Sequence, residues 1–229
     1  MIIGGLQKTT LIDYPGKVAA TVFTGGCNFF CGFCHNPEFV LVQKNENFMS
    51  EEQFFWWLEK KIGLLEGVCI TGGEPTIHSD LPDFIKKIKE LHFLVKLDTN
   101  GTNPQMLENL IKDNLVDYLA MDIKAPLQKY QQFYKQIIDT ENIEQSVSLV
   151  KKFPRHEFRT TVIPTIHAKS DLLDIAKWLG GANKYVLQQF RSDKTLDPSC
   201  KSIEPYPEKE LRNFCEMLKG YFGRCELRI

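Results

Sequence analysis

The sequence predicts an α/β fold, an incomplete barrel built from six βα units. Short runs rich in apolar and β-branched residues alternate with longer amphipathic segments, which is typical of a parallel sheet covered by helices. Polar residues of reactive type follow most of the short runs. Barrels carry their active sites at the carboxyl ends of their strands, whereas an open sheet concentrates them at one switch point. The spread of these residues over several strand ends favours the barrel.

The predicted strands are six short runs, rich in β-forming residues, that fit buried parallel strands. They span residues 18–25, 67–73, 94–101, 116–124, 157–164 and 184–190.

Helix signals lie between these runs. Ser50 and Gln53 have the spacing of a capping box, Pro82 and Pro104 fall in first turns, and Gly180 is a C-cap candidate. Amphipathic patterns continue to the end of the chain, over residues 140–153, 170–181 and 207–222.

Length and charge limit the classes of protein to consider. The chain has 229 residues and a formal net charge of −1. Its length fits one large domain or two small ones, and we expect a single domain over residues 1–229. Near-zero charge argues against a general nucleic-acid binder or a polybasic membrane anchor. The start of the chain lacks a signal-peptide pattern, and no run approaches the ~18 apolar residues of a membrane span. We therefore expect a cytoplasmic protein without a membrane or nucleic-acid partner.

Three of the seven cysteines lie close together in the stretch "TGGCNFFCGFCHNP". Cys27, Cys31 and Cys34 are spaced four and three residues apart. An odd cysteine count in an expected cytoplasmic chain is a poor disulfide framework. A [4Fe–4S] cluster held by three thiolates leaves one iron open for another ligand. A zinc site completed by a residue such as His35 remains an alternative, although zinc ligands usually come as two separated pairs.

Other strand ends carry groups with open interpretations. Gly72, Gly73 and Glu74 offer backbone carbonyls and a carboxylate that suit an ammonium group, or they form a plain turn. Strand alternation places Asp122 and Lys124 on one face, where they bind a ligand or pair with each other. Arg159 lies on the fifth predicted strand. If its side chain points inward, its guanidinium needs a carboxylate or ligand partner; if it points outward, it is solvated.

These motifs together resemble the radical S-adenosylmethionine (SAM) superfamily. The Cys-x3-Cys-x2-Cys spacing after the first strand resembles its signature, and "ITGGEP" resembles its Gly-Gly-Glu element. "LDTNG" and "MDIK" resemble more closely the activases of glycyl radical enzymes. The opening "LQKTTLIDYPGKVAATVFTGGCNFFCGFCHNPEFV" resembles the group that activates anaerobic ribonucleoside-triphosphate reductase.

The resemblance implies a fold and an activity. The fold would be the incomplete (βα)6 TIM-like barrel of radical SAM proteins, with a core at about 16–190 and a C-terminal helical extension at about 191–229. A single reduced [4Fe–4S] cluster would bind SAM and cleave it reductively, and the resulting 5′-deoxyadenosyl radical would remove a hydrogen atom from a glycine of a partner enzyme. The chain would be an oxidoreductase whose expected partner is anaerobic ribonucleoside-triphosphate reductase and whose expected electron donor is a flavodoxin or ferredoxin.

The resemblance also implies site residues. The cluster would be held by Cys27, Cys31 and Cys34. Asp98, Thr99 and Asp122 would bind a monovalent cation beside the SAM carboxylate. SAM itself would be contacted by Phe33, Gly72, Gly73, Glu74, Lys124 and Arg159, with Gln189 as a looser match.

Three other functions stay open at this point. The chain could activate a different glycyl radical enzyme of the pyruvate formate-lyase type. It could be a radical SAM enzyme for a small molecule, such as a deazapurine synthase. Outside the enzymes, the cysteines could belong to a zinc-binding interaction domain.

Overall fold

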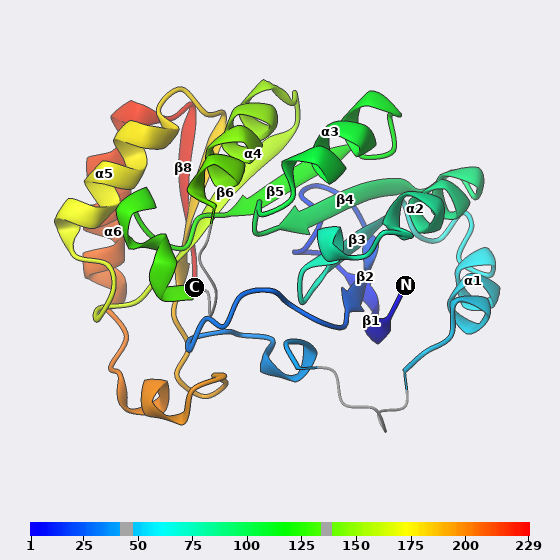
Figure 1. Ribbon diagram of the computed structural model, residues 1–229, viewed down its shortest axis with the longest axis horizontal. Coiled ribbons are helices and arrows are strands. Elements are labelled where there is room, and N and C mark those ends of the chain that lie inside the picture. The colour runs from blue at the N-terminus through cyan, green and yellow to red at the C-terminus, as the bar shows by residue number, and fades with distance from the viewer. Residues whose placement is uncertain (42–47, 134–138) are drawn as a thin grey trace. The chain divides into compact units, whose positions relative to one another are not determined.

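The computed structural model describes residues 1–41, 48–133 and 139–229, which form eight β-strands and six α-helices (Figure 1). Backbone contacts divide the chain into two compact units, each described by itself below. The first unit contains residues 1–28 and 38–119, and the second contains residues 29–37 and 120–229. The cysteine-rich loop is shared between them, because Cys27 belongs to the first unit and the other two cysteines belong to the second.

The sheet of the first unit follows the chain order of its strands. These are β1 (Ile3–Thr10), β2 (Ala19–Thr24), β3 (Gly67–Gly72) and β4 (Leu94–Thr99). β1 is antiparallel to β2, whereas β2, β3 and β4 are parallel. The register sets Thr21, Cys69 and Lys96 side by side, and all three are fully buried. Neighbours in register point to the same face of a sheet. One polar layer therefore crosses three buried strands.

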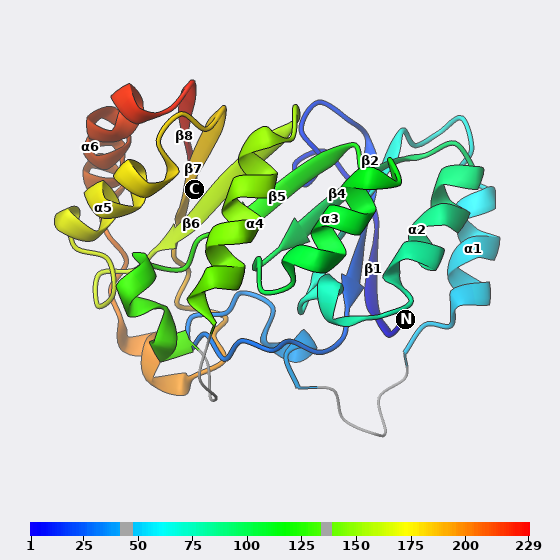
Figure 2. The same cartoon turned by 45° about the horizontal axis from the view of Figure 1, so that its top comes forward.

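Three helices of the first unit cover this sheet, and aromatic contacts join two of them. They are α1 (Glu51–Glu59), α2 (Leu81–Glu90) and α3 (Pro104–Lys112). The predicted capping box of α1 is confirmed, since Ser50 and Gln53 exchange side-chain and backbone hydrogen bonds at 3.1 and 3.2 Å. α1 and α2 lie side by side (Figures 1 and 2), and the Phe54 and Phe84 rings stack at 5.3 Å.

The second unit repeats the alternation of strands and helices. Its strands are β5 (Tyr118–Asp122, whose first two residues fall in the first unit), β6 (His156–Val162), β7 (Lys184–Gln189) and β8 (Arg224–Arg228). Its helices are α4 (Thr140–Lys152), α5 (Lys169–Leu179) and α6 (Glu208–Leu218). β6, β7 and β8 are parallel. The Ile123 N–H donates to the Arg159 carbonyl at 2.7 Å, which holds the end of β5 against β6.

The six predicted strands are all present, and the α/β class is confirmed. Two further strands were not predicted. β1 escapes the pattern because Gly4 and Gly5 interrupt it. β8 lies in the extension predicted as helical, which thus contains α6 followed by a strand.

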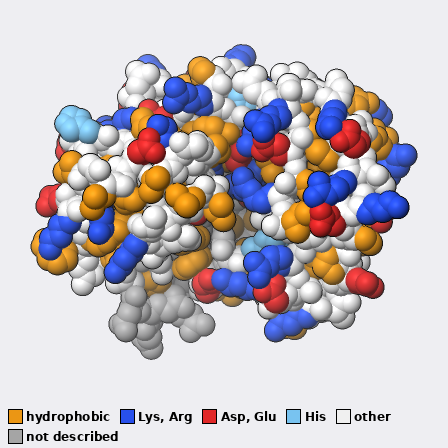
Figure 3. Space-filling model, turned by 180° about the vertical axis from the view of Figure 1, so that it is seen from behind, with side chains coloured by type: hydrophobic (Ala, Val, Ile, Leu, Met, Phe, Trp, Pro, Cys, Tyr) orange, Lys and Arg blue, Asp and Glu red, His pale blue; other side chains and the backbone are white. Residues whose placement is uncertain are grey.

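On the face shown in Figure 3, basic and acidic side chains are interspersed, and neither sign of charge dominates. This agrees with the formal net charge of −1. None of the helices in the described part of the chain has the length and apolar character that crossing a membrane requires.

Candidate functional site

The two ends of the cysteine loop are joined by backbone hydrogen bonds in the first unit. The Gly26 N–H donates to the Phe39 carbonyl at 2.7 Å, and the Cys27 N–H donates to the Val40 carbonyl at 3.2 Å. We call these two pairs the loop base. They hold the backbone of the first cysteine before any ligand binds.

The Gly-Gly turn after β3 packs directly on this loop base. The Glu74 N–H donates to the Gly26 carbonyl at 2.8 Å. A Cβ atom on Gly73 would lie 1.9 Å from that carbonyl oxygen, so no larger residue fits. Gly72 has φ +108°, a conformation that L-residues avoid. Both glycines are therefore required for the close approach of two backbone segments.

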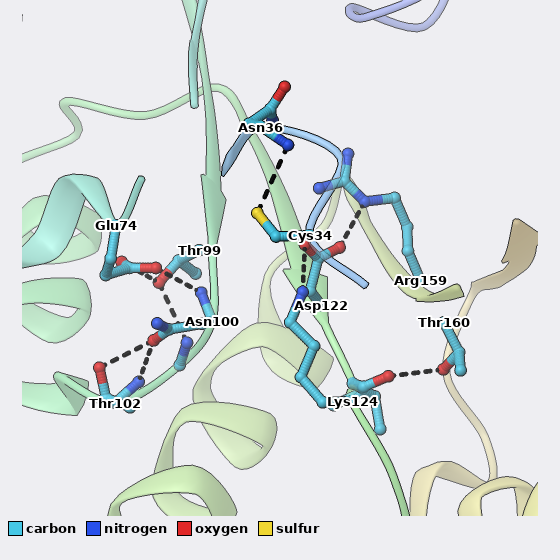
Figure 4. A network of polar contacts seen from close by, with 12 residues as sticks. Cys34, Asn36, Glu74, Thr99, Asn100, Thr102, Asp122, Lys124, Arg159 and Thr160 are labelled. Atoms are coloured by element: carbon cyan, nitrogen blue, oxygen red, sulfur yellow. Dashed lines mark hydrogen bonds and ion pairs between the residues drawn. The ribbon is translucent and has the colours of Figure 1, made fainter. Parts of the chain in front are cut away.

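Glu74 lies at the centre of a buried hydrogen-bond network at the ends of β3 and β4 (Figure 4). Its Oε1 accepts from the Thr99 hydroxyl at 2.7 Å and from the hydroxyl and N–H of Thr76 at 2.5 and 3.1 Å. Its Oε2 accepts from the Asn100 N–H at 2.6 Å. Burial raises the pKa of Glu74 above its usual range, although these four donors act in the opposite direction. The carboxylate ties two strand ends together.

An amide network that was not predicted extends this region towards the cysteine loop. Asn28, next to Cys27, accepts from the Asn100 side-chain amide at 2.8 Å and donates to the Thr102 hydroxyl at 2.8 Å. The Asn100 side-chain oxygen in turn accepts from the Thr102 N–H and hydroxyl. The sequence signal was only "TNGT", in which each residue reads as a turn former.

Asp98 lies at the end of β4 and is paired with a lysine that sequence reasoning missed. The Lys96 ammonium donates to Asp98 Oδ1. Cys69, opposite Lys96 on β3, has its sulfur 3.8 Å from both the Lys96 nitrogen and Asp98 Oδ1. The signal in the sequence was a lysine two residues before the aspartate in an otherwise apolar strand.

The other two cysteines of the motif lie on a tight turn in the second unit. The Cys34 N–H donates to the Cys31 carbonyl at 3.0 Å, and Cys34 Sγ accepts from the Asn36 N–H at 3.4 Å (Figure 4). Burial raises the pKa of the Cys31 thiol to about 12, while the Lys124 charge acts in the opposite direction. None of the seven cysteines, all of which lie in the described part of the chain, forms a disulfide bond.

Aromatic side chains surround this turn. The Phe33 ring meets Phe133 edge-on at 5.9 Å, and the Phe30 N–H donates to the Phe133 carbonyl at 2.9 Å. The His35 ring stacks on Phe190 at 6.3 Å, and its Nε2 accepts from the Arg191 N–H at 3.3 Å. Burial lowers the pKa of His35. His35 thus packs the loop against the end of β7.

Asp122 at the end of β5, Lys124 just after it and Arg159 in the middle of β6 form an ion-pair group (Figure 4). Arg159 Nε donates to Asp122 Oδ1 at 2.8 Å, and Lys124 Nζ donates to Asp122 Oδ2 at 3.0 Å. The alternative of an outward, solvated Arg159 is wrong, since the residue is buried. Burial opposes the charge on Asp122, but the two cations hold its pKa below its usual range. Burial likewise opposes the charge on Lys124, and the Asp122 carboxylate raises its pKa.

The backbone of Lys124 is held on both sides by buried groups. Its N–H donates to the Tyr130 hydroxyl at 3.1 Å, and its carbonyl lies 2.8 Å from His167 Nε2. Because the Ile163 N–H donates to His167 Nδ1 at 3.1 Å, the ring proton is on Nε2. The Nε2–H therefore donates a hydrogen bond to the Lys124 carbonyl. His167 was not singled out from the sequence, in which nothing links it to position 124.

Gln189, the loosest of the predicted SAM contacts, lies at the end of β7. Its side-chain amide donates to the Tyr206 carbonyl at 3.0 Å, which ties β7 to the C-terminal extension. The predicted site residues thus form two groups that are internally bonded: Glu74 with Thr99 in the first unit, and Asp122 with Lys124 and Arg159 in the second.

A family comparison identifies the class of protein that carries this arrangement. The model of the radical SAM superfamily matches residues 21–179, so the chain belongs to that superfamily and is an enzyme. The match includes the three cysteines of the loop, the Gly-Gly-Glu turn and the two internally bonded groups. It excludes the zinc-binding interaction domain that the cysteines alone left open.

Individual relatives indicate which group within the superfamily this chain resembles. A putative glycyl-radical enzyme activating enzyme of Methanocaldococcus jannaschii is 35% identical over 99% of this chain and 95% of its own length. The pyruvate formate-lyase-activating enzyme of Clostridium pasteurianum is 29% identical over 53% of this chain and 52% of its own. The chain is thus homologous to activating enzymes of glycyl radical enzymes.

Solved structures share the fold. The structure of Streptococcus suis SuiB bound to the precursor peptide SuiA has a TM-score of 0.67 and 14% identity, and the match covers 90% of this chain. This chain spans about half the length of SuiB, at 47%. These likenesses confirm the predicted fold class, an incomplete α/β barrel of the radical SAM type.

Proposed function

We propose that this protein is a radical SAM activase that cleaves SAM reductively at one [4Fe–4S] cluster and generates a glycyl radical on a partner enzyme. The observation that carries the proposal is the 35% identity to a putative activating enzyme across nearly the whole of both chains. A likeness of this extent includes both polar groups at the strand ends as well as the cysteine loop.

The loop residues fit a cluster by the chemistry of their donors. Cys27, Cys31 and Cys34 are not joined in disulfide bonds, and soft thiolate ligands suit iron–sulfur clusters. A thiol that coordinates a metal is deprotonated, so the raised pKa of Cys31 means that a proton leaves when the cluster assembles. Once bound, the cluster would supply the electron for SAM cleavage, which yields the radical that takes a hydrogen atom from glycine.

The two polar groups would then have separate tasks in binding SAM. The carbonyls around Gly72 and Gly73 would accept from its amino group, and Glu74 would keep that turn in place through its four internal donors. Asp122, Lys124 and Arg159 together carry two positive charges and one negative charge. The remaining positive charge would attract the SAM carboxylate.

Phe33 and Gln189 complete the proposed contacts with SAM. The Phe33 ring, already edge-on to Phe133, would lie against the adenine. Gln189 would act from the end of β7, where its amide now bonds to the backbone of Tyr206. Both roles depend on the proposed activity and are tested with it.

The proposed partner is anaerobic ribonucleoside-triphosphate reductase, and the proposed electron donor is a flavodoxin or ferredoxin, in the cytoplasm. The opening stretch around Asp13, Tyr14 and Pro15 supports this choice of partner through its resemblance to that group of activases. An activase of the pyruvate formate-lyase type would use the same SAM-binding residues, so the partner has to be decided by experiment.

The test is radical transfer under anaerobic conditions. Reconstituted protein, SAM and a chemical reductant are mixed with one candidate glycyl radical enzyme at a time, and electron paramagnetic resonance is recorded. We expect a glycyl radical on the reductase. The variant Cys31→Ala should lose SAM cleavage by at least about a thousandfold, because its cluster lacks a ligand. The matched control Cys215→Ala, on α6, should keep it.

Two results would contradict this function. Retained SAM cleavage by Cys31→Ala would exclude the proposed role of the loop. Efficient SAM cleavage without a radical on any glycyl radical enzyme would favour an enzyme that acts on a small molecule.

A further inference from the structure

Lys96 occupies an unusual place for a lysine. It lies in the middle of β4, and its side chain is 1% exposed. Lysine is almost never fully buried unless its charge is paired. Here the ammonium donates to Asp98 Oδ1, whose side chain is 9% exposed. The pair is therefore a fixed part of the interior of the first unit.

The surroundings of the ammonium are built by strand register and an aromatic ring. The sulfur of Cys69, opposite on β3, lies 3.8 Å from Lys96 Nζ. The centroid of the Tyr118 ring lies 5.8 Å from the same nitrogen, within the range of a cation–π contact. Carboxylate, sulfur and ring face all favour a positive charge at this point.

The expected monovalent cation does not fit this arrangement. Its three predicted ligands already have partners: Asp98 accepts from Lys96, Thr99 donates to Glu74, and Asp122 accepts from Arg159 and Lys124. A second unit charge beside Asp98 would be repelled by the ammonium, and the repulsion is strong where water is scarce. One positive charge next to the Asp98 carboxylate is enough to balance it.

We propose that the Lys96 ammonium takes the place of the monovalent cation, so that this protein binds SAM without one. Lys96 is then a positioning residue. It neutralises Asp98 and thereby fixes the conformation of the end of β4, which includes Thr99. The inference rests on the proposed function in one respect, the assumption that SAM binds at these strand ends. The charge balance of Asp98 does not depend on it.

The first experiment measures SAM affinity of the reconstituted wild-type protein in different salts. Calorimetric titrations are made in potassium, sodium and tetramethylammonium chloride at one ionic strength, so that general screening is constant. We expect dissociation constants that agree within about twofold. A loss of affinity of about tenfold or more in tetramethylammonium chloride would overturn the proposal.

The second experiment removes the charge and asks whether a cation restores function. Lys96→Met keeps the length of the side chain without its ammonium. Its SAM affinity should fall by about tenfold or more in tetramethylammonium chloride and recover largely in potassium chloride. The control is Lys86→Met on α2, an exposed lysine paired with Asp83, which should show no dependence on the cation. Equal affinity of Lys96→Met in all three salts would contradict the proposal.

A third readout needs no SAM. The thermal midpoint of apoprotein Lys96→Met should be higher in potassium than in tetramethylammonium chloride, because potassium can balance Asp98. Adding Asp98→Asn should abolish that difference. If wild-type protein fails to bind SAM in every salt, the proposed function fails, and the thermal midpoints still decide the role of Lys96. If Lys96→Met does not fold, the wild-type titrations decide it.

Discussion

Two carboxylates at strand ends, Glu74 in the first unit and Asp122 in the second, are held in opposite ways. Glu74 is 1% exposed and accepts from hydroxyls and backbone N–H groups, and its pKa is raised. The Asp122 side chain is 32% exposed and lies between two cations, and its pKa is lowered. Burial dominates at Glu74, whereas neighbouring charges dominate at Asp122.

The difference separates the tasks of the two regions. A carboxylate surrounded by backbone and hydroxyl donors fixes the shape of the chain, because its donors lie on two segments, at Thr76 after β3 and at Thr99 and Asn100 at the end of β4. A carboxylate shared by two cations leaves one positive charge over, which a ligand with a carboxylate can use. Three changes test this contrast through the free energy of unfolding.

The largest effect is expected at Glu74. Glu74→Ala removes the acceptor of four hydrogen bonds and leaves the Asn100 and Thr76 N–H groups buried without it. Together with the cavity, this should lower the free energy of unfolding by about 4 kcal/mol. Urea denaturation of the apoprotein measures it. Glu74→Gln keeps the volume and one oxygen and should cost about half as much. Equal, small losses for both variants would mean that the network does not fix the strand ends.

The next effect concerns His167 and pH. Burial lowers the pKa of His167 to about 4, from about 6.5 in an unfolded chain. The folded state therefore binds this proton less readily, so stability is complete above about pH 6.5 and falls towards pH 4. The loss should reach about 3 kcal/mol.

Urea denaturation between pH 7 and pH 4.5 checks this expectation. His167→Gln should flatten the slope, whereas the exposed control His92→Gln should keep it. An unchanged slope in His167→Gln would show that His167 does not hold Lys124 as a neutral ring.

The smallest of the three effects is expected at Asp122. Asp122→Asn leaves Arg159 and Lys124 without their shared anion. Removing one partner of a buried pair is costly, but Asp122 is about one-third exposed, so we expect about 2 kcal/mol. Thermal or urea unfolding measures it, and adding Lys124→Met should recover part of the loss. No recovery in the double variant would mean that repulsion between the two cations is not the cause.

The sequence predicted the elements that follow a strong pattern. All six predicted runs became strands, because short β-rich runs between helical patterns leave a clear signal. β1, with Gly4 and Gly5, and β8, with its alternating charges, were missed because they gain their strand conformation from pairing with β2 and β7. Tertiary context decides such segments.

The site was predictable in its residue types and less so in their contacts. The strand alternation correctly placed Asp122 and Lys124 together. The same alternation puts Lys96 and Asp98 on one face of β4, but their pairing was not predicted. His167 lies 43 positions from Lys124 in the chain, and no local pattern reports a contact at that separation. The roles of the site residues in SAM binding stay predictions.

The loop base has a consequence for recovery from oxygen damage. Closing a loop lowers its conformational entropy. In this protein the hydrogen bonds of the loop base offset that loss when the chain folds, without a metal. Small metal-binding domains whose loops close only around their metal unfold when it is lost. In this protein we expect the chain to stay folded when air destroys the cluster, so that the cluster can be reconstituted with iron and sulfide on the same molecule.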